Sequence, residues 1–321
     1  MTARGWCRPS EPPRNGIMNQ QNKTALALQG GGVHGAYAWG VLDRLLEDGL
    51  QVDRVCGVSS GALLAAMLTQ GLVKDGPQGA RREMTKLWDR MRTASALSPL
   101  QNGPIERWLW GWDLSNNLAF QGMETALRMF SPAQMNPFGH NPLRAIIDDV
   151  IDLRAIRDPS AIRLTIAATD VETGEAKCWS NADITIDVLL ASACLPLVFH
   201  AVAIDGRSYW DGGFSGNPPL GPLLEPELPD ELVLIRAQTA KRSGVPSTPA
   251  EIMNRLTEIA CHGVLEAELR TLPASVRVTS HGADAVLSQL PISSKFNTGD
   301  AFIFNLFEAG RDAAAADLAA E

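Results

Sequence analysis

Apolar runs and helical patterns alternate most clearly between residues 24 and 68. Residues 24–29 form a short apolar run of the kind found in buried strands, and residues 52–58 form a second one. Between the two runs, apolar residues recur with helical spacing at Ala38, Val41, Leu42, Leu45 and Leu46. Asp48 and Gly49 are typical of a helix end, and the apolar residues 62–68 predict another helix. The pattern therefore predicts a strand–helix–strand–helix unit.

Strand-like and helical segments continue to alternate along the rest of the chain. Further strands are expected at residues 162–168, 176–180, 201–204, 208–210, 231–236 and 276–279. Further helices are expected at residues 80–91, 123–130, 142–150, 187–193 and 249–270, with a final helix that carries Phe302, Ile303, Leu306 and Phe307. The chain has no repeats and no clear linker. We therefore expect one α/β domain at residues 24–321, a three-layer α/β/α fold with a mostly parallel central sheet.

The longest of these predicted helices, at residues 249–270, carries a regular apolar stripe. Its members are Ile252, Leu256, Ile259, Val264 and Leu265. Because an amphipathic helix buries its apolar stripe, we expect these side chains to face the core.

Composition and charge narrow the class of protein. The chain is 45% hydrophobic and 20% charged, with a net charge of −8, which is typical of a globular protein. This acidity argues against nucleic acid as a partner and gives no attraction to anionic lipid. The five cysteines are scattered at positions 7, 56, 178, 194 and 261, without a disulfide framework or metal-binding spacing. We therefore expect a cytoplasmic protein, with peripheral contact to a membrane surface left open.

The N-terminal residues 1–23 carry no apolar core of a signal peptide. We expect them to form a disordered arm, and Met18 is an alternative start of the natural protein. The longest apolar stretch, residues 188–204, is interrupted by Pro196 and His200 and is too short to span a bilayer. No transmembrane helix is expected.

A serine stands at the end of the second predicted strand, in the sequence Gly57-Val58-Ser59-Ser60-Gly61. A serine on a tight strand-to-helix turn presents its hydroxyl, and the next N–H and the helix N-terminus can bind an oxyanion. The glycines let such a turn close. Ser59 is therefore a candidate nucleophile, and the alternative is a serine that only caps the helix.

Three consecutive glycines, Gly30, Gly31 and Gly32, follow the first predicted strand. They allow a turn whose N–H groups point at a ligand. With Gly35 the run also fits the dinucleotide-binding spacing, which requires an acid about 20 residues later. Asp53 is near that distance, but it opens the second strand instead of ending it, which argues against a nucleotide site.

An acid followed by two glycines, Asp211-Gly212-Gly213, comes after a predicted hairpin. The glycines allow the carboxylate to sit on a tight turn close to another backbone. On its own, an ordinary Asp-Gly turn would be the simpler interpretation. A Ser–His–Asp triad with the histidine after the acid would need His262 or His281, and neither lies in a motif.

Together these motifs resemble the patatin-like phospholipase family, which combines G-G-G-x-[basic]-G, G-x-S-x-G and a later D-G-G or D-G-A. The block Ala191–Pro196 and the pair Asn217-Pro218 also match, so the resemblance covers about residues 24–220. It implies a serine ester hydrolase in which Asp211 takes the Ser59 proton directly, without a metal or cofactor, through an acyl-Ser59 intermediate. The implied oxyanion hole comprises Gly30, Gly31, Gly32, His34 and Ser60.

His34 stands where family members often carry Arg or Lys. A neutral imidazole cannot supply a fixed positive charge to a phosphate. Uncharged esters, such as neutral lipids, short acyl esters or hydroxyalkanoate oligomers, are therefore more attractive substrates than phospholipids. An acyltransferase with the same nucleophile and a non-catalytic lipid-binding scaffold are the alternatives. A binder would not need the serine, the acid and the glycine loop together.

Residues 74–138 resemble the family least. They include a tryptophan-rich segment, Trp108, Leu109, Trp110 and Trp112. Consecutive residues of a helix point in different directions, so these side chains cannot all enter one core. We expect a lid or acyl-chain wall that touches lipid, because tryptophan favours such interfaces. A packing segment or an oligomer contact is the alternative.

Overall fold

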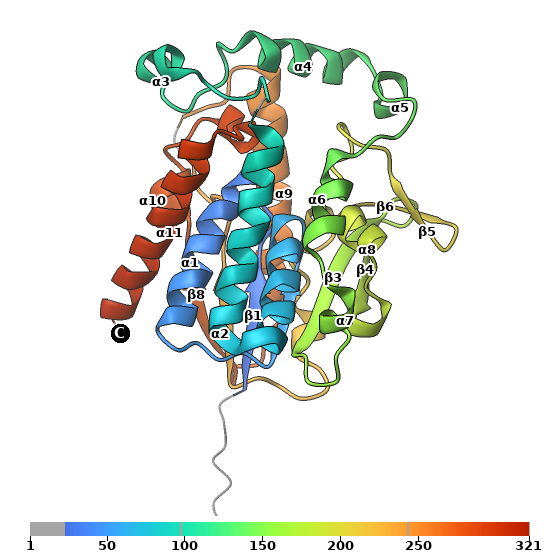
Figure 1. Ribbon diagram of the computed structural model, residues 1–321, viewed down its shortest axis with the longest axis vertical. Helices are drawn as coiled ribbons and strands as arrows, with labels where there is room; N and C mark the ends of the chain where they lie inside the picture. The colour runs from blue at the N-terminus through green and yellow to red at the C-terminus, as the bar shows by residue number, and fades with distance from the viewer. Residues whose placement is uncertain (1–22, 97, 243, 321) are drawn as a thin grey trace, which may run out of the picture.

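A single sheet runs through the centre of the molecule. The computed structural model describes residues 23–96, 98–242 and 244–320, and the prediction for residues 1–22 lies outside them. Within these residues eight strands pair in the order β5-β6-β3-β2-β1-β7-β8, and β4 pairs with β3 off this path (Figure 1). The strands are β1 Thr24–Leu28, β2 Arg54–Gly57, β3 Arg163–Asp170, β4 Ala176–Ser180, β5 Val202–Ile204, β6 Arg207–Asp211, β7 Glu231–Ile235 and β8 Arg277–His281.

Five neighbouring strands, β3, β2, β1, β7 and β8, are parallel. The other three join by antiparallel pairing: β4 and β6 pair with β3, and β5 pairs with β6. The expected mostly parallel central sheet is confirmed. The hairpin predicted before Asp211 is present as β5–β6, and β3 and β4 form a second one.

Helices cover both faces of this sheet. They are α1 Gly35–Glu47, α2 Ser60–Ser95, α3 Pro104–Trp110, α4 Leu118–Met129, α5 Pro132–Met135, α6 Pro142–Val150, α7 Leu153–Ile156, α8 Ile186–Ser192, α9 Pro249–Leu269, α10 Asp284–Leu287 and α11 Asp300–Ala320. Helix α2 contains non-helical backbone at Asp75 and Gly76, so the helix predicted at residues 80–91 is its second half. None of the described helices has the length and apolar character needed to cross a membrane.

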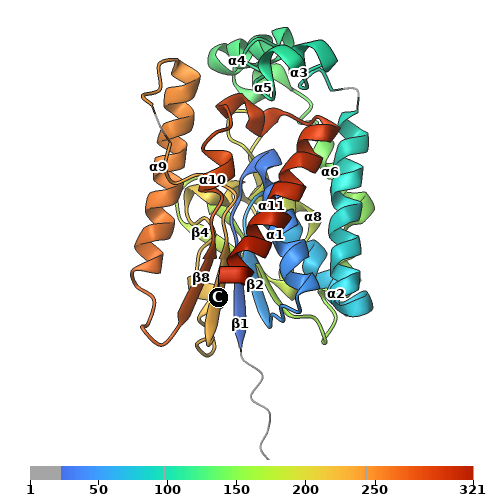
Figure 2. The same cartoon turned by 90° about the vertical axis from the view of Figure 1, so that its left-hand side faces the viewer.

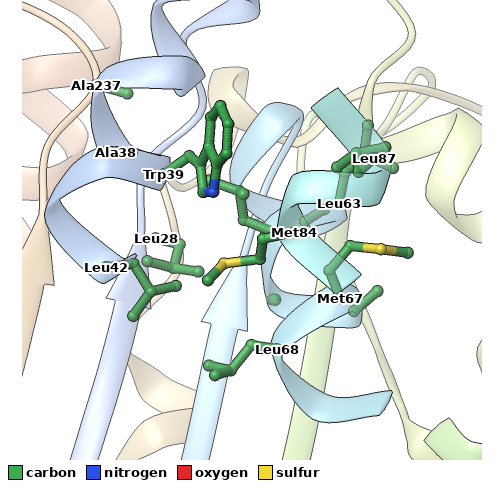
Figure 3. Close-up of a cluster of buried hydrophobic side chains, with 14 of the residues drawn as sticks. Leu28, Ala38, Trp39, Leu42, Leu63, Met67, Leu68, Met84, Leu87 and Ala237 are labelled. Carbon is green, nitrogen blue, oxygen red and sulfur yellow. The ribbon is translucent and has the colours of Figure 1, made fainter. Parts of the chain in front are cut away.

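Alternate residues of β1 enter two different cores. Leu26 and Leu28 belong to the larger core with α1, α2 and α11, part of which is drawn in Figure 3. Ala25 and Ala27 belong to a smaller core that includes Leu265 of α9. Figure 2 shows α9 on one side of the sheet and α2 on the other. The single three-layer α/β/α domain is therefore confirmed.

The expected inward face of α9 is wrong over most of the helix. Ile252, Leu256 and Ile259 are 43%, 55% and 54% exposed, whereas Leu265 is buried. The buried positions in the middle of the helix are Glu258 and Cys261. On this face of α9, Glu258 forms ion pairs with three cationic side chains. The helix is therefore rotated to bury a charge and expose its apolar stripe.

Candidate active site

Ser59 sits on a strained turn between β2 and α2. Its φ of 54° and ψ of −127° place a non-glycine residue in the left-handed half of backbone space. Ser192 of α8 holds this turn, because the Ser59 N–H donates to its carbonyl at 3.1 Å and its hydroxyl at 3.0 Å. A side chain at Gly61 would place Cβ 2.3 Å from the Leu28 carbonyl oxygen. The G-x-S-x-G spacing therefore has a direct steric cause.

The sheet register brings Asp211 to the same level as Ser59. In the β2–β3 pair, Gly57 lies opposite Ile166. Two residues further along β3, Ala168 pairs with Asp211 at the end of β6. Ser59 is likewise two residues beyond Gly57, so the serine and the acid stand on either side of the end of β3. The structure thus brings together two residues that are far apart in the sequence.

Asp211 is buried beside the nucleophile candidate, and the Ser59 hydroxyl influences its pKa. Burial raises its pKa to about 6, against the opposing effect of hydrogen bonds from the Gly213 N–H and the Ser59 hydroxyl. The Gly213 N–H lies 2.9 Å from Oδ1. A carboxylate with a pKa near neutrality is a better proton acceptor at pH 7 than an ordinary aspartate.

Neither candidate histidine approaches this pair. His281 ends β8, three strands away from β2, and three strand spacings amount to about 14 Å. Its Nδ1 lies 2.8 Å from a carboxylate oxygen of Asp317. His262 lies on α9, with Nδ1 3.8 Å from Glu266. The arrangement of the described residues is therefore a serine–aspartate pair without an intervening imidazole.

The glycine loop continues from β1 into a short 3-10 helix, Gly32–His34. Two of its N–H groups are already engaged: Gly30 donates to Asn217 Oδ1 at 2.9 Å, and Gly31 donates to Ser60 Oγ at 3.1 Å. Within the described residues the N–H groups of Gly32 and Ser60 have no acceptor. As the first N–H groups of two helical segments, they are open to an oxyanion.

His34 does not supply a positive charge to the site. It is 1% exposed, and its Nε2 lies 2.8 Å from Ser294 Oγ. Burial lowers its pKa to about 3, aided by the charges of Lys295 and Arg242. Its backbone N–H donates to the Gly31 carbonyl at 3.2 Å. The imidazole is neutral at pH 7, as expected from the sequence.

A buried charged cluster beside the loop was not predicted. Glu258 of α9 is 1% exposed and lies within 3.2 Å of three cationic side chains, those of Arg242, Arg255 and Lys295. Burial alone would raise the pKa of Glu258, but these charges and hydrogen bonds lower it to about 2. We call these four residues the Glu258 cluster. They are spread over more than 50 positions, so no local motif signals them.

Three short helices, α3 to α5, form a cap beyond the carboxyl ends of the parallel strands (Figures 1 and 2). Trp108, Leu109 and Trp110 are 83%, 53% and 41% exposed. Only Trp112, just after α3, turns inward, with its ring 5.1 Å from that of Phe302. The expectation that these side chains cannot share one core is confirmed.

A cavity of about 760 Å³ opens beneath the cap. It is bounded by α4, by the loop before α9 and by the first turns of α9. Arg242 and Arg255 of the Glu258 cluster line it, together with Ser293. Ser293 is next in sequence to Ser294, which contacts His34, but the glycine loop itself does not line this cavity.

Comparison with known proteins identifies a family. A sequence model of the patatin-like phospholipase family matches residues 26–224. No curated protein sequence matches the chain.

Two solved structures resemble it at low identity. VipD from Legionella pneumophila is 14% identical with a TM-score of 0.44, covering 94% of this chain and 67% of VipD. ExoU, in the ExoU–SpcU complex of the type III secretion system of Pseudomonas aeruginosa, is 16% identical with a TM-score of 0.39. That match covers 93% of this chain and 52% of ExoU, so the chain spans about half of ExoU. Both likenesses are too weak to add evidence on activity.

The family match covers more than half of the chain and includes the glycine loop, Ser59 and Asp211. Family membership supports a lipid hydrolase function. The chain belongs to the patatin-like phospholipase family.

Proposed function

We propose that this protein is a serine ester hydrolase that cleaves carboxylic esters of lipids or other acyl compounds through an acyl-Ser59 intermediate. The observation that carries the proposal is the sheet register that brings Ser59 beside Asp211, a buried carboxylate whose pKa is raised to about 6. A serine that only capped α2 would not need this partner, and its side chain forms no cap hydrogen bond.

In the proposed acylation step, Asp211 accepts the Ser59 proton as Oγ attacks the ester carbonyl. The N–H groups of Gly32 and Ser60, with the N-terminal dipole of α2, stabilise the oxyanion of the tetrahedral intermediate. Gly31 can join them by exchanging Ser60 Oγ for the substrate. The protonated Asp211 then donates its proton to the departing alkoxide oxygen, and the acyl group remains on Ser59.

Deacylation reverses these roles. A water molecule gives one proton to Asp211 and its oxygen attacks the acyl carbon. The tetrahedral intermediate collapses, the proton returns from Asp211 to Ser59 Oγ, and the carboxylic acid leaves. Asp211 therefore acts as base and acid in turn, a role suited to a pKa of about 6.

The lipid nature of the substrate is supported by the cap. Its exposed Trp108 and Leu109 suit contact with a lipid surface or a long acyl chain. The neutral His34 favours uncharged esters near the loop. Residues 77–95 of α2 bury Met84 and Trp88 in the larger core, so the proposed lid is confined to α3–α5.

The test is turnover of a graded series of p-nitrophenyl esters by wild type and by Ser59→Ala. We expect a chain-length optimum in wild type and loss of activity in the variant. Ser275→Ala, which changes an exposed serine, is the matched control and keeps wild-type activity. A folded wild type with no turnover, with or without detergent micelles, would contradict the proposal and favour a lipid-binding scaffold. Adding a glycerol acceptor distinguishes hydrolysis from acyl transfer, which would yield a new ester.

A further inference from the structure

The side chain of Asn217 lies inside the site and has no role in the steps above. It follows the short 3-10 helix Gly212–Phe214 and is fully buried. Its Oδ1 accepts the Gly30 N–H at 2.9 Å. An N–H requires an acceptor, so the oxygen of this amide, and not its nitrogen, faces Gly30. The orientation of the amide is therefore fixed.

The Asn217 amide lies near two glycines, Gly30 and Gly213, that adjoin the proposed catalytic pair. A Cβ at Gly213 would lie 3.8 Å from Asn217 Nδ2 and 3.1 Å from Asp211 Oδ1. On the other side, a Cβ at Gly30 would lie 2.7 Å from the Cβ of Ser59. Asn217 thus borders both glycine segments that hold the catalytic pair.

Within the described residues, the Nδ2 group of Asn217 is buried and has no hydrogen-bond partner. An unsatisfied buried donor is destabilising, so such groups are rare unless a ligand or water satisfies them. The group lies near Gly213, whose N–H is bonded to the Asp211 carboxylate, and this position indicates which oxygen would satisfy it. During turnover, first the leaving oxygen and then the attacking water exchange a proton with Asp211, and both must stand beside its carboxylate.

We propose that Asn217 is a further catalytic residue, whose Nδ2 donates a hydrogen bond to the oxygen that exchanges protons with Asp211. In acylation this bond stabilises negative charge on the leaving alkoxide, and in deacylation it holds the attacking water by a lone pair. Asn217 transfers no proton; protons move only between Ser59, Asp211 and the substrate or water oxygen. The inference rests on the proposed serine hydrolase function.

The role predicts different effects on the two halves of one reaction. p-Nitrophenolate is a weakly basic leaving group that departs without a donor, whereas deacylation needs the positioned water. Asn217→Asp keeps an acceptor for Gly30 and removes the donor. With p-nitrophenyl esters, its first-turnover burst should stay close to wild type. Its steady-state rate should fall by on the order of 10²- to 10³-fold, as for loss of one oxyanion donor. Intact-mass analysis should then show accumulated acyl enzyme.

The control is Gln238→Met. Gln238 also holds the glycine loop, with Nε2 donating to the Gly30 carbonyl at 2.8 Å, but it offers no free donor beside Asp211. Its loss should slow the burst and the steady state together. All rates are taken on the alkaline plateau of the pH profile, because a second carboxylate beside Asp211 raises its pKa. Thermal unfolding checks that each variant folds, and Asn217→Ser replaces Asn217→Asp if that variant does not.

Burst and steady-state rates that fall equally in the Asn217 variant, or that do not fall, would overturn this role. That result differs from failure of the proposed function, in which wild type would show no acyl enzyme and no burst at all.

Discussion

Two regions of this protein differ in whether their apolar side chains are buried or exposed. At the carboxyl ends of β1 and β2, apolar side chains are buried and backbone segments touch so closely that Gly61 has no room for a Cβ. In the cap and the first half of α9, large apolar side chains such as Trp108 and Leu256 are exposed. In the first half of α9 the buried side chain is a charged one, Glu258, surrounded by three cations.

The difference separates the region that holds the proposed catalytic pair from the region that we propose contacts the substrate. The strand-end region fixes the positions of Ser59 and Asp211 through backbone contacts that leave no room for added atoms. The cap exposes apolar side chains that the core does not use, which suits a lipid partner. The Glu258 cluster replaces an apolar core at the boundary and joins α9 to the loop near His34.

The largest expected effect concerns the acid of the strand-end region. Asp211→Asn should lower kcat by on the order of 10²- to 10⁴-fold, the usual contribution of a general base. Because burial raises the pKa of Asp211 to about 6 and only the ionised form accepts a proton, wild-type activity should rise with pH through about pH 6. Asp205→Asn, at an exposed hairpin turn, is the control and should be neutral. A flat profile around pH 6 would break the assignment.

The Glu258 cluster can be tested by Glu258→Gln. Removing the one carboxylate that three cations share should cost about 3–5 kcal/mol of unfolding free energy, measured by chemical denaturation. The folded pKa of about 2 lies below the ordinary value of 4.5, so this stabilisation is present above pH 4.5 and is lost as pH falls toward 2. Glu308→Gln on the exposed side of α11 should change stability by less than about 0.5 kcal/mol. Equal effects at the two sites would refute a structural role for the cluster.

One substitution, glycine to alanine, should have opposite signs in the two regions. At Gly61 the new Cβ would meet the Leu28 carbonyl at 2.3 Å, and overpacking should cost about 1–3 kcal/mol. At Gly122, in α4 of the cap, nothing lies within 4 Å, and helix propensity should stabilise by about 0.5–1 kcal/mol. Thermal unfolding of both variants measures these two changes in stability. If both substitutions destabilised the protein, the predicted difference between the two regions would be wrong.

The smallest expected change in stability belongs to the cap surface. Trp108→Ser removes a side chain that is 83% exposed, so unfolding should shift by less than about 0.5 kcal/mol. Partitioning onto vesicles of uncharged lipid should weaken about tenfold, because burial of one aromatic side chain contributes about 1.5–3 kcal/mol. Phe304→Ser, an exposed aromatic on α11, is the control and should bind as wild type. If Trp108→Ser instead changed the sedimentation mass, the cap would be an oligomer contact.

The strand-end region could be predicted from the sequence because its causes are local. A Cβ would collide with a neighbouring backbone carbonyl at Gly57, Gly61 and Gly212. Only glycine fits at such positions, so they appear in the sequence as short glycine motifs. The strands around them are continuous apolar runs, as buried parallel strands should be. The pairing of Ser59 with Asp211 came from family resemblance, and the register across β3 supplies its physical reason.

The orientation of α9 could not be predicted, because its cause is not local. A stripe of isoleucine and leucine indicates the buried face of a helix only if no other face binds the rest of the protein more strongly. Here Lys295 and Arg242, distant in sequence, bind Glu258 and rotate that stripe outward. Asn217 was likewise seen only as part of a motif, because its contact with Gly30 joins residues 187 positions apart.

Intact-protein mass after treatment with a fluorophosphonate ester tests the central claim most directly. The reagent phosphonylates an activated serine, so wild type should gain one adduct. Ser59→Ala should gain none, and Asp211→Asn should react far more slowly because its serine lacks a base. An adduct of equal yield on Ser59→Ala, or no adduct on folded wild type in the presence of micelles, would contradict Ser59 as the nucleophile.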